Sequence, residues 1–113
     1  MGNRQGPGSG TVEIMSLPVR FRAAAQAEFD EAIDWYARGG AGLGTSFAQA
    51  VQDRLDEISQ SPQRHPVIDD DVREAPVAGF PYCIYYRARS GSIVVVAVYH
   101  QSRDPAGWRS RPR

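Results

Sequence analysis

The chain has 113 residues, of which 42% are hydrophobic and 23% charged, and its formal net charge is zero. This composition is typical of one soluble globular domain and excludes a disordered chain, and the single cysteine excludes an internal disulfide or a cysteine-rich zinc site. The sequence contains no apolar stretch of membrane-spanning length and no secretion signal, so it predicts a cytoplasmic protein with no membrane association.

The N-terminal half is predicted to supply a leader, a strand and a helix. Residues 1–14 are rich in glycine and are expected to be a flexible leader or a leftover of cloning, with one domain over residues 15–113. Residues 17–21 predict a short strand. A helix follows and ends near Arg38, before two glycines; its apolar residues recur at helical spacing: Ala25, Phe29, Ala32, Ile33 and Tyr36. We expect Trp35 and Tyr36 to anchor this helix, with Glu28, Glu31 and Asp34 facing solvent.

A second helix is predicted after the Gly42-Leu43-Gly44 turn. Its apolar stripe consists of Phe47, Val51, Leu55 and Ile58, and Ser61-Pro62 marks its end. Two helices joined by so short a turn pack as an antiparallel hairpin.

Beyond Pro66 the pattern becomes extended and predicts strands over residues 72–77, 82–87 and 93–99. Pro76 confines the first of them to an edge or a bulge, whereas the last is apolar on both faces and should lie centrally. The fold class is therefore α+β, with an N-terminal strand and an antiparallel two-helix hairpin packed on a mainly antiparallel sheet of three to four strands. A polar, arginine-rich tail follows from residue 100 to residue 113.

Residues whose side chains could take part in catalysis or binding lie just beyond the last predicted strand. An imidazole titrates near neutrality, so His100 could act as an acid or base, while Arg103 and Arg109 could hold a phosphate. Alternatively, His100 only caps the strand by hydrogen bonding and Asp104 pairs with an arginine. Neither a phosphate-binding loop nor metal-ligand spacing is present, so no cofactor and no metal are expected.

The remaining polar residues have structural interpretations. His65 is expected to be a solvated loop residue, residues 69–71 a solvated acidic turn, and Cys83 a buried, inert thiol. All thirteen basic residues are arginines, and net charge is −3 over residues 15–61 and +3 from residue 62 onward. The basic C-terminal half permits an anionic partner.

Four segments, in order, resemble the RelE/ParE superfamily of bacterial type II toxins. They are residues 28–36, the Gly42-Leu43-Gly44 turn before Phe47, residues 80–87, and residues 98–100 with Arg103-Asp104-Pro105 and Trp108. The similarity runs from Pro18 to Arg109. The resemblance implies a toxin that forms a hetero-oligomer with a cognate antitoxin, which wraps around it and holds it inactive.

The superfamily contains two activities. RelE-like members cut messenger RNA on the ribosome with lysines, arginines and a C-terminal tyrosine, whereas ParE-like members inhibit DNA gyrase and hydrolyse nothing themselves. This chain has no lysine, has Cys83 where the ribonuclease carries an arginine, and has Trp108 in place of the tyrosine. The sequence therefore favours the gyrase inhibitor, which is not an enzyme. The alternatives are a messenger RNA endoribonuclease using His100, Arg103 and Arg73, or an inactive relic that only binds antitoxin as a co-repressor.

Two sets of contact residues follow from the favoured resemblance. The target would be contacted by Arg73, Arg103, Trp108 and Arg109, with His100 orienting their loop. The antitoxin would be bound along the helical hairpin by Phe29, Ile33, Tyr36, Val51 and Leu55.

Overall fold

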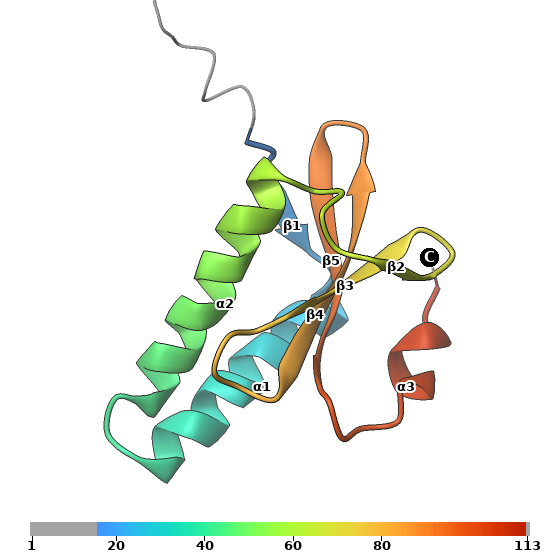
Figure 1. The fold of residues 1–113 in the computed structure, drawn as a ribbon. Coiled ribbons are helices and arrows are strands. Elements are labelled where there is room, and N and C mark those ends of the chain that lie inside the picture. Colours follow the sequence, from blue (N-terminus) through green and yellow to red (C-terminus); the bar gives the residue numbers. More distant parts are fainter. Residues whose placement is uncertain (1–15, 113) are drawn as a thin grey trace, which may run out of the picture.

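The structure, a computed structural model, describes residues 16–112, so the predicted leader lies outside the described residues. In this described part of the chain, two long helices and five strands form the body, and a short helix follows the last strand (Figure 1). In chain order the elements are β1 (Val19–Phe21), α1 (Ala23–Gly39), α2 (Leu43–Gln60), β2 (Val67–Asp69), β3 (Val72–Pro76), β4 (Tyr82–Arg89), β5 (Ser92–His100) and α3 (Ala106–Arg109).

The strands form one sheet in the order β1-β5-β4-β3-β2. β1 runs parallel to β5, and the other neighbours are antiparallel. The predicted α+β class, N-terminal strand and helical hairpin are confirmed, but the sheet has five strands rather than three to four. The extra strand is β2, which has only three residues in a polar connection and gains strand conformation by pairing with β3.

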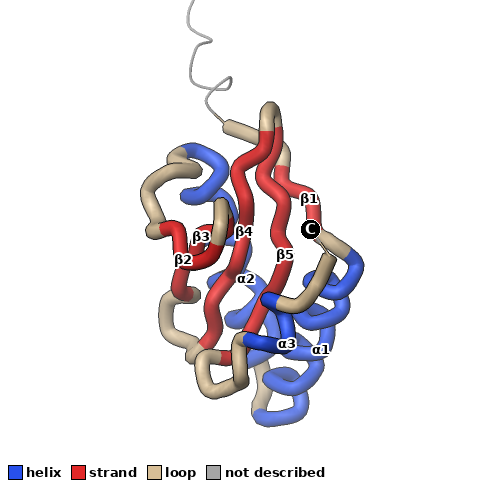
Figure 2. The backbone as a smooth tube through the Cα atoms, turned by 90° about the vertical axis from the view of Figure 1, so that its right-hand side faces the viewer, coloured by secondary structure: helices blue, strands red, loops and turns tan. Residues whose placement is uncertain are grey.

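Helices cover both faces of the sheet. α1 and α2 pack on one face, and α3 lies against the other, toward the viewer in Figure 2. Each face has its own apolar cluster, because successive residues of a strand point to opposite sides. The cluster under the hairpin includes Phe47, Val51, Leu55, Ile58, Ile84, Tyr86 and Val95, and the cluster under α3 consists of Val72, Cys83, Tyr85, Ala97, Tyr99 and Trp108.

The turn between α1 and α2 depends on two glycines. Gly42 has φ = 80°, in the left-handed region that glycine adopts without steric cost. At Gly44 a β-carbon would lie 2.9 Å from the carbonyl oxygen of Ile33. The absence of side chains at these positions lets the hairpin helices approach each other closely.

Two expectations about α1 are wrong. Trp35 is 64% exposed and does not anchor the helix, because its neighbour Tyr36 occupies the inner face, with ring centroids 5.0 Å from both Phe47 and Phe80. Glu28 does not face solvent: its side chain is only 12% exposed and forms an ion pair with Arg111. The sequence contains a signal for this burial, because Glu28 lies three residues after Ala25 and four before Ala32, on the buried stripe of the helix.

Candidate functional site

A groove of about 400 Å³ lies between α1 and the C-terminal half of β5, and we call it the edge groove. It is lined by Glu28, Glu31, Ala32, Asp34, Trp35, Arg38, Tyr82, Val98, His100 and Arg103. It therefore contains His100 and Arg103 from the predicted sites. Sequence reasoning missed the contributions of Trp35 and Arg38, which project from a helix that was expected to pack on the sheet.

The groove exists because β1 is short. β1 pairs only with residues Ile93 to Val95 of β5, so within residues 16–112 no strand lies along the rest of that edge of β5. Side chains take the strand's place: the Val98 N–H donates to Glu28 Oε1 at 3.0 Å, and Arg111 Nη1 donates to the Val96 carbonyl at 2.9 Å. The ion pair between Glu28 and Arg111 joins these two caps.

His100 is held by its own loop. Its Nδ1 accepts a hydrogen bond from the Ser102 backbone N–H at 3.0 Å, and its ring packs edge-on against Tyr82 at 5.1 Å. Because Nδ1 is an acceptor here, the neutral ring carries its proton on Nε2. The structure thus shows the capping role that was one interpretation of His100.

The loop beyond His100 leaves Arg103 on the surface. The Arg103 guanidinium lies 4.1 Å from the centre of the Tyr99 ring, a cation–π contact that supports an exposed side chain. Asp104 accepts a hydrogen bond from the Ala106 N–H at 2.9 Å. It thus forms an Asx turn before α3, and the expected pairing with an arginine is wrong.

Trp108 and Arg109 lie over the other face of the sheet. Trp108 is 3% exposed and stacks on Tyr85 with 4.4 Å between ring centroids. Its ring is thus a core group of that face, which contradicts the expected surface contact. Arg109 is exposed and lies 4.0 Å from the carboxylate of Asp69.

Arg73 lies apart from His100 and Arg103. It is opposite Tyr86 on one side of β4, whereas His100 is opposite Tyr82 on the other side. Four residues of β4 separate these positions, about 13 Å along the strand. The three residues proposed for a ribonuclease therefore do not converge on one point.

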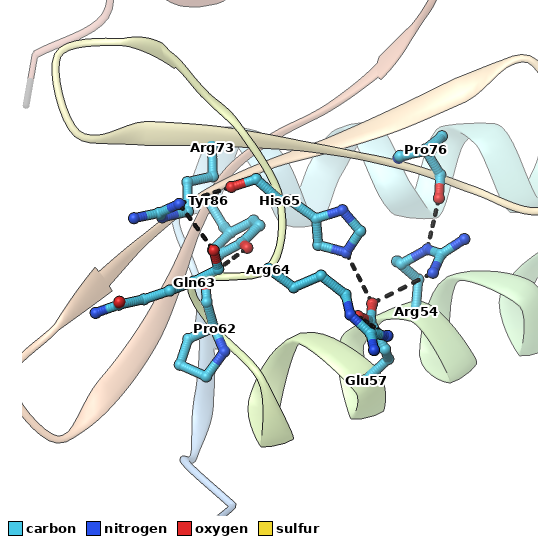
Figure 3. Close-up of polar contacts among 9 residues, drawn as sticks. All are labelled: Arg54, Glu57, Pro62, Gln63, Arg64, His65, Arg73, Pro76 and Tyr86. Atoms are coloured by element: carbon cyan, nitrogen blue, oxygen red, sulfur yellow. Dashed lines mark hydrogen bonds and ion pairs between the residues drawn. The ribbon is translucent and has the colours of Figure 1, made fainter.

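Arg73 instead fixes the loop between α2 and β2 (Figure 3). Its Nη1 donates to the carbonyl oxygens of His65 at 2.6 Å and Gln63 at 3.2 Å. The Tyr86 hydroxyl donates to the Pro62 carbonyl at 2.8 Å, which holds the same loop from β4.

Glu57, near the end of α2, is the centre of the charged part of this network (Figure 3). It accepts hydrogen bonds from Arg54 at 3.2 Å and Arg64 at 3.0 Å, and His65 Nε2 lies 2.8 Å away. Burial acts to raise the pKa of Glu57, but the hydrogen bonds from His65 and the two arginines outweigh it and hold the pKa below its usual value. The His65 side chain is 12% exposed, so the expectation of a solvated loop residue is wrong.

The lowered pKa of Glu57 predicts an acid-sensitive contribution to stability. A carboxyl group whose pKa is lowered by folding stabilises the fold above its unfolded pKa, and this stabilisation is lost as the pH falls below about 5 through the lowered value. We expect Glu57→Gln to cost about 1–3 kcal/mol at pH 7. The variant should also lose stability less steeply than the wild type on acidification, in urea unfolding measured at several pH values.

The matched control is Asp56→Asn, because Asp56 is exposed and bonds only to the side chain of Gln52 among the described residues. We expect this change to shift neutral stability by no more than about 0.5 kcal/mol. Equal effects of the two substitutions would contradict the role given to Glu57.

The acidic turn between β2 and β3 also does more than face solvent. Asp71 accepts hydrogen bonds from Arg87, a residue that is only 4% exposed. These hydrogen bonds hold the pKa of the Asp71 carboxyl group below its usual value. A buried guanidinium requires such a counter-charge. Residues 69–71 are therefore partly structural, and the expectation of a purely solvated turn is wrong.

Two further expectations concern buried side chains. Cys83 is buried, as expected, and burial raises the pKa of its thiol, which keeps it in the unreactive protonated form. Of the residues assigned to the antitoxin, Val51 and Leu55 are core groups beneath the hairpin, with 0% and 3% exposure. They are thus covered by the protein itself, and only Phe29, Ile33 and Tyr36 are half-buried.

Across residues 16–112 no three His, Cys, Asp or Glu side chains are grouped so that they could hold a metal ion. None of the helices described is both long and apolar enough to cross a membrane.

Comparisons with known proteins agree with this fold. The family model described as ParE toxin of type II toxin-antitoxin system, parDE, matches residues 19–105. A solved structure titled "Chromosomal ParDE TA system from P. aeruginosa" is similar with a TM-score of 0.64 and 15% sequence identity, covering 76% of this chain and 97% of that chain. At that identity the likeness shows the fold. No curated protein sequence matches the chain.

Proposed function

The chain belongs to the family of ParE toxins of type II toxin-antitoxin systems, and from this premise we propose that it inhibits DNA gyrase and is neutralised by a cognate antitoxin. It would act in the cytoplasm, as the partner of that antitoxin, without catalysing a reaction. The ribonuclease and the inactive relic are the outcomes that the experiment below must separate from this function.

The observation that most supports gyrase inhibition over a ribonuclease is the distance of Arg73 from the edge groove. Cleavage of RNA needs a proton acceptor and cations placed around one phosphate. Here Arg73 donates to two backbone carbonyls on the far side of β4, and His100 Nδ1 is already hydrogen-bonded to Ser102. In the proposed function, His100 therefore orients the loop beside the edge groove and does not act as a proton acceptor.

The exposed arginines near the C-terminus supply the proposed contact with the target. Arg103 is supported by the Tyr99 ring, and Arg109 is positioned above Trp108, with its guanidinium carbon 5.5 Å from the indole centre. Trp108 would thus serve the contact indirectly, by fixing α3 to the sheet. Arg73 is half-buried, so only the exposed part of its side chain could contact the target.

The decisive experiment compares two targets. We expect the purified chain to block DNA supercoiling by gyrase, or to trap cleaved DNA, while ribosome-bound messenger RNA stays intact. His100→Ala should weaken gyrase inhibition only modestly, because it removes about one hydrogen bond, roughly 0.5–1.5 kcal/mol. In a ribonuclease the same change would lower the cleavage rate by roughly 10²- to 10⁴-fold.

Two controls accompany this comparison. Arg103→Ala should weaken inhibition of gyrase, whereas Arg64→Ala, an exposed arginine outside the edge groove, should not. Cleaved messenger RNA with unaffected gyrase would replace the proposal by the ribonuclease. Activity on neither target would favour the relic.

A further inference from the structure

We propose that Tyr99 is the positioning residue of the target contact: its ring holds the segment from Arg103 to Arg111 against the sheet and so fixes where Arg103 and Arg109 lie. This role rests on the proposed function, which assigns the two arginines to the target. The contacts of the ring belong to the free protein, so they can be tested without the target.

The backbone of this segment is hardly bonded to the sheet. The Gln101 N–H donates to the Pro81 carbonyl, and among the described residues it is the last backbone N–H in the chain that donates to a carbonyl of the sheet or its loops. From Arg103 to Arg111, the backbone N–H groups that donate to backbone carbonyls use acceptors within residues 100–108. The position of the segment therefore depends on its side-chain contacts.

Tyr99 contacts the segment at three points. Its side chain is buried in the apolar cluster under α3. The Arg103 guanidinium lies over the ring, 4.1 Å from its centre, and that of Arg111 lies 5.8 Å from it. Between these two residues in the chain, Gly107 packs against the Tyr99 hydroxyl. One ring thus supports the beginning, the middle and the end of the segment, whose helix α3 lies in front of the sheet in Figure 2.

Gly107 is the point of closest approach. It lies in α3 without a positive φ, so the backbone does not require glycine here, and alanine is the better helix former. A β-carbon at this position would collide with the Tyr99 hydroxyl oxygen, whereas the next nearest atom, Cζ of the same ring, would be 3.3 Å away. The contact between Gly107 and the hydroxyl therefore sets how closely α3 approaches β5.

The position of Arg109 follows from that of α3. Its guanidinium carbon lies 5.5 Å from the indole centre of Trp108, which itself stacks on Tyr85. Tyr85 of β4 and Tyr99 of β5 thus hold the short helix from two neighbouring strands. A shift of α3 would move Arg109 while Arg103 stays on the Tyr99 ring, and the spacing of the two charges would no longer match their partners on the target.

NMR of the free protein tests the ring contact. Protons above an aromatic ring are shielded, so we expect the Arg103 side-chain signals of the wild type to be shifted upfield. Tyr99→Phe should retain these shifts because it keeps the ring, and Tyr99→Leu should abolish them. Unshifted Arg103 signals in the wild type, or shifts that persist in folded Tyr99→Leu, would overturn the proposal.

Because Tyr99→Leu also removes a buried ring, a second arm keeps the ring and changes Gly107. Gly107→Ala should shift the indole N–H signal of Trp108 and raise the concentration for half-inhibition of gyrase about tenfold, the equivalent of one lost interface contact. In a Tyr99→Phe background the same change should raise that concentration by less than about twofold, because the missing hydroxyl leaves room for the β-carbon. The Trp108 signal should then also stay close to that of Tyr99→Phe alone.

The matched control is Gly39→Ala at the end of α1. A β-carbon there would meet Leu43 Cδ1 at an ordinary 3.9 Å, so this variant should leave the Trp108 signal and gyrase inhibition unchanged. Inhibition is compared at equal concentrations of folded protein, determined by urea unfolding, so that lost stability is not counted as lost inhibition.

Two results of this second arm would overturn the proposal: equal effects of Gly107→Ala in the two backgrounds, or an effect of Gly39→Ala as large as that of Gly107→Ala. A wild type that does not inhibit gyrase would contradict the proposed function. The Arg103 and Trp108 signals of the free protein would still decide whether Tyr99 positions the segment, so either proposal can fail while the other stands.

Discussion

Replacing Trp108 with alanine is expected to lower the free energy of unfolding by about 3–5 kcal/mol, the usual cost of deleting a buried aromatic side chain. Trp108 is 3% exposed and belongs to the apolar cluster under α3, where it stacks on Tyr85. α3 has only four residues and cannot be stable alone, so its position depends on this ring. Urea unfolding followed by circular dichroism measures the loss.

Two tryptophan controls separate burial from surface contact. Trp35→Ala should change stability by no more than about 0.5 kcal/mol, because Trp35 is 64% exposed. Trp108→Phe should cost less than Trp108→Ala, because it keeps an aromatic ring and removes an indole N–H that has no acceptor among the described residues. If Trp108→Ala were as mild as Trp35→Ala but abolished gyrase inhibition, Trp108 would be a target contact after all.

The elements that could be predicted from the sequence are those with strong periodicity. The stripe from Phe47 to Ile58 marks the inner face of α2, and all of its members are buried. The apolar run from Ile93 to Tyr99 predicts a central strand, and β5 lies between β1 and β4. In both cases burial of the side chains and the local pattern agree, so the pattern alone is enough.

Short elements and distant polar pairs could not be predicted in this way. β2 and α3 have three and four residues, too few to show a period. Glu28 and Arg111 are 83 positions apart, and their ion pair exists only because the chain end returns across the sheet. A residue such as His65 looks like an ordinary loop residue until its partner Glu57 is placed beside it.

The same reasoning explains the mixed outcome for the candidate site. His100 and Arg103 could be selected because they follow directly on a strong strand, and they do line the edge groove. Arg73 has the same chemistry as Arg103, but the strand order places it across β4. Which residues meet in space depends on sheet topology, which the local sequence pattern does not contain.

Phe47→Ala is expected to be as damaging as the loss of Trp108, again about 3–5 kcal/mol. Phe47 is fully buried at the centre of an aromatic cluster that joins both helices to the sheet. Its ring centroid lies 6.1 Å from that of Phe29, 5.0 Å from Tyr36, 5.2 Å from Phe80 and 5.0 Å from Tyr82. Small domains are stable by only about 5–15 kcal/mol, so this variant should unfold at a markedly lower urea concentration.

The effect of Phe47→Ala should also reach the edge groove through Tyr82. The Tyr82 ring packs on Phe47 and, at 5.1 Å, on the ring of His100. A cavity at Phe47 therefore removes the support of a groove residue, and we expect the NMR signals of the His100 ring to shift. Ile58→Ala is the matched control, because Ile58 is equally buried in α2 but lies three helical turns further along, away from this aromatic cluster. It should lower stability by a similar amount, about 2–5 kcal/mol, and leave His100 unchanged. If both variants shifted His100 equally, the groove would be responding to global loosening and not to Tyr82.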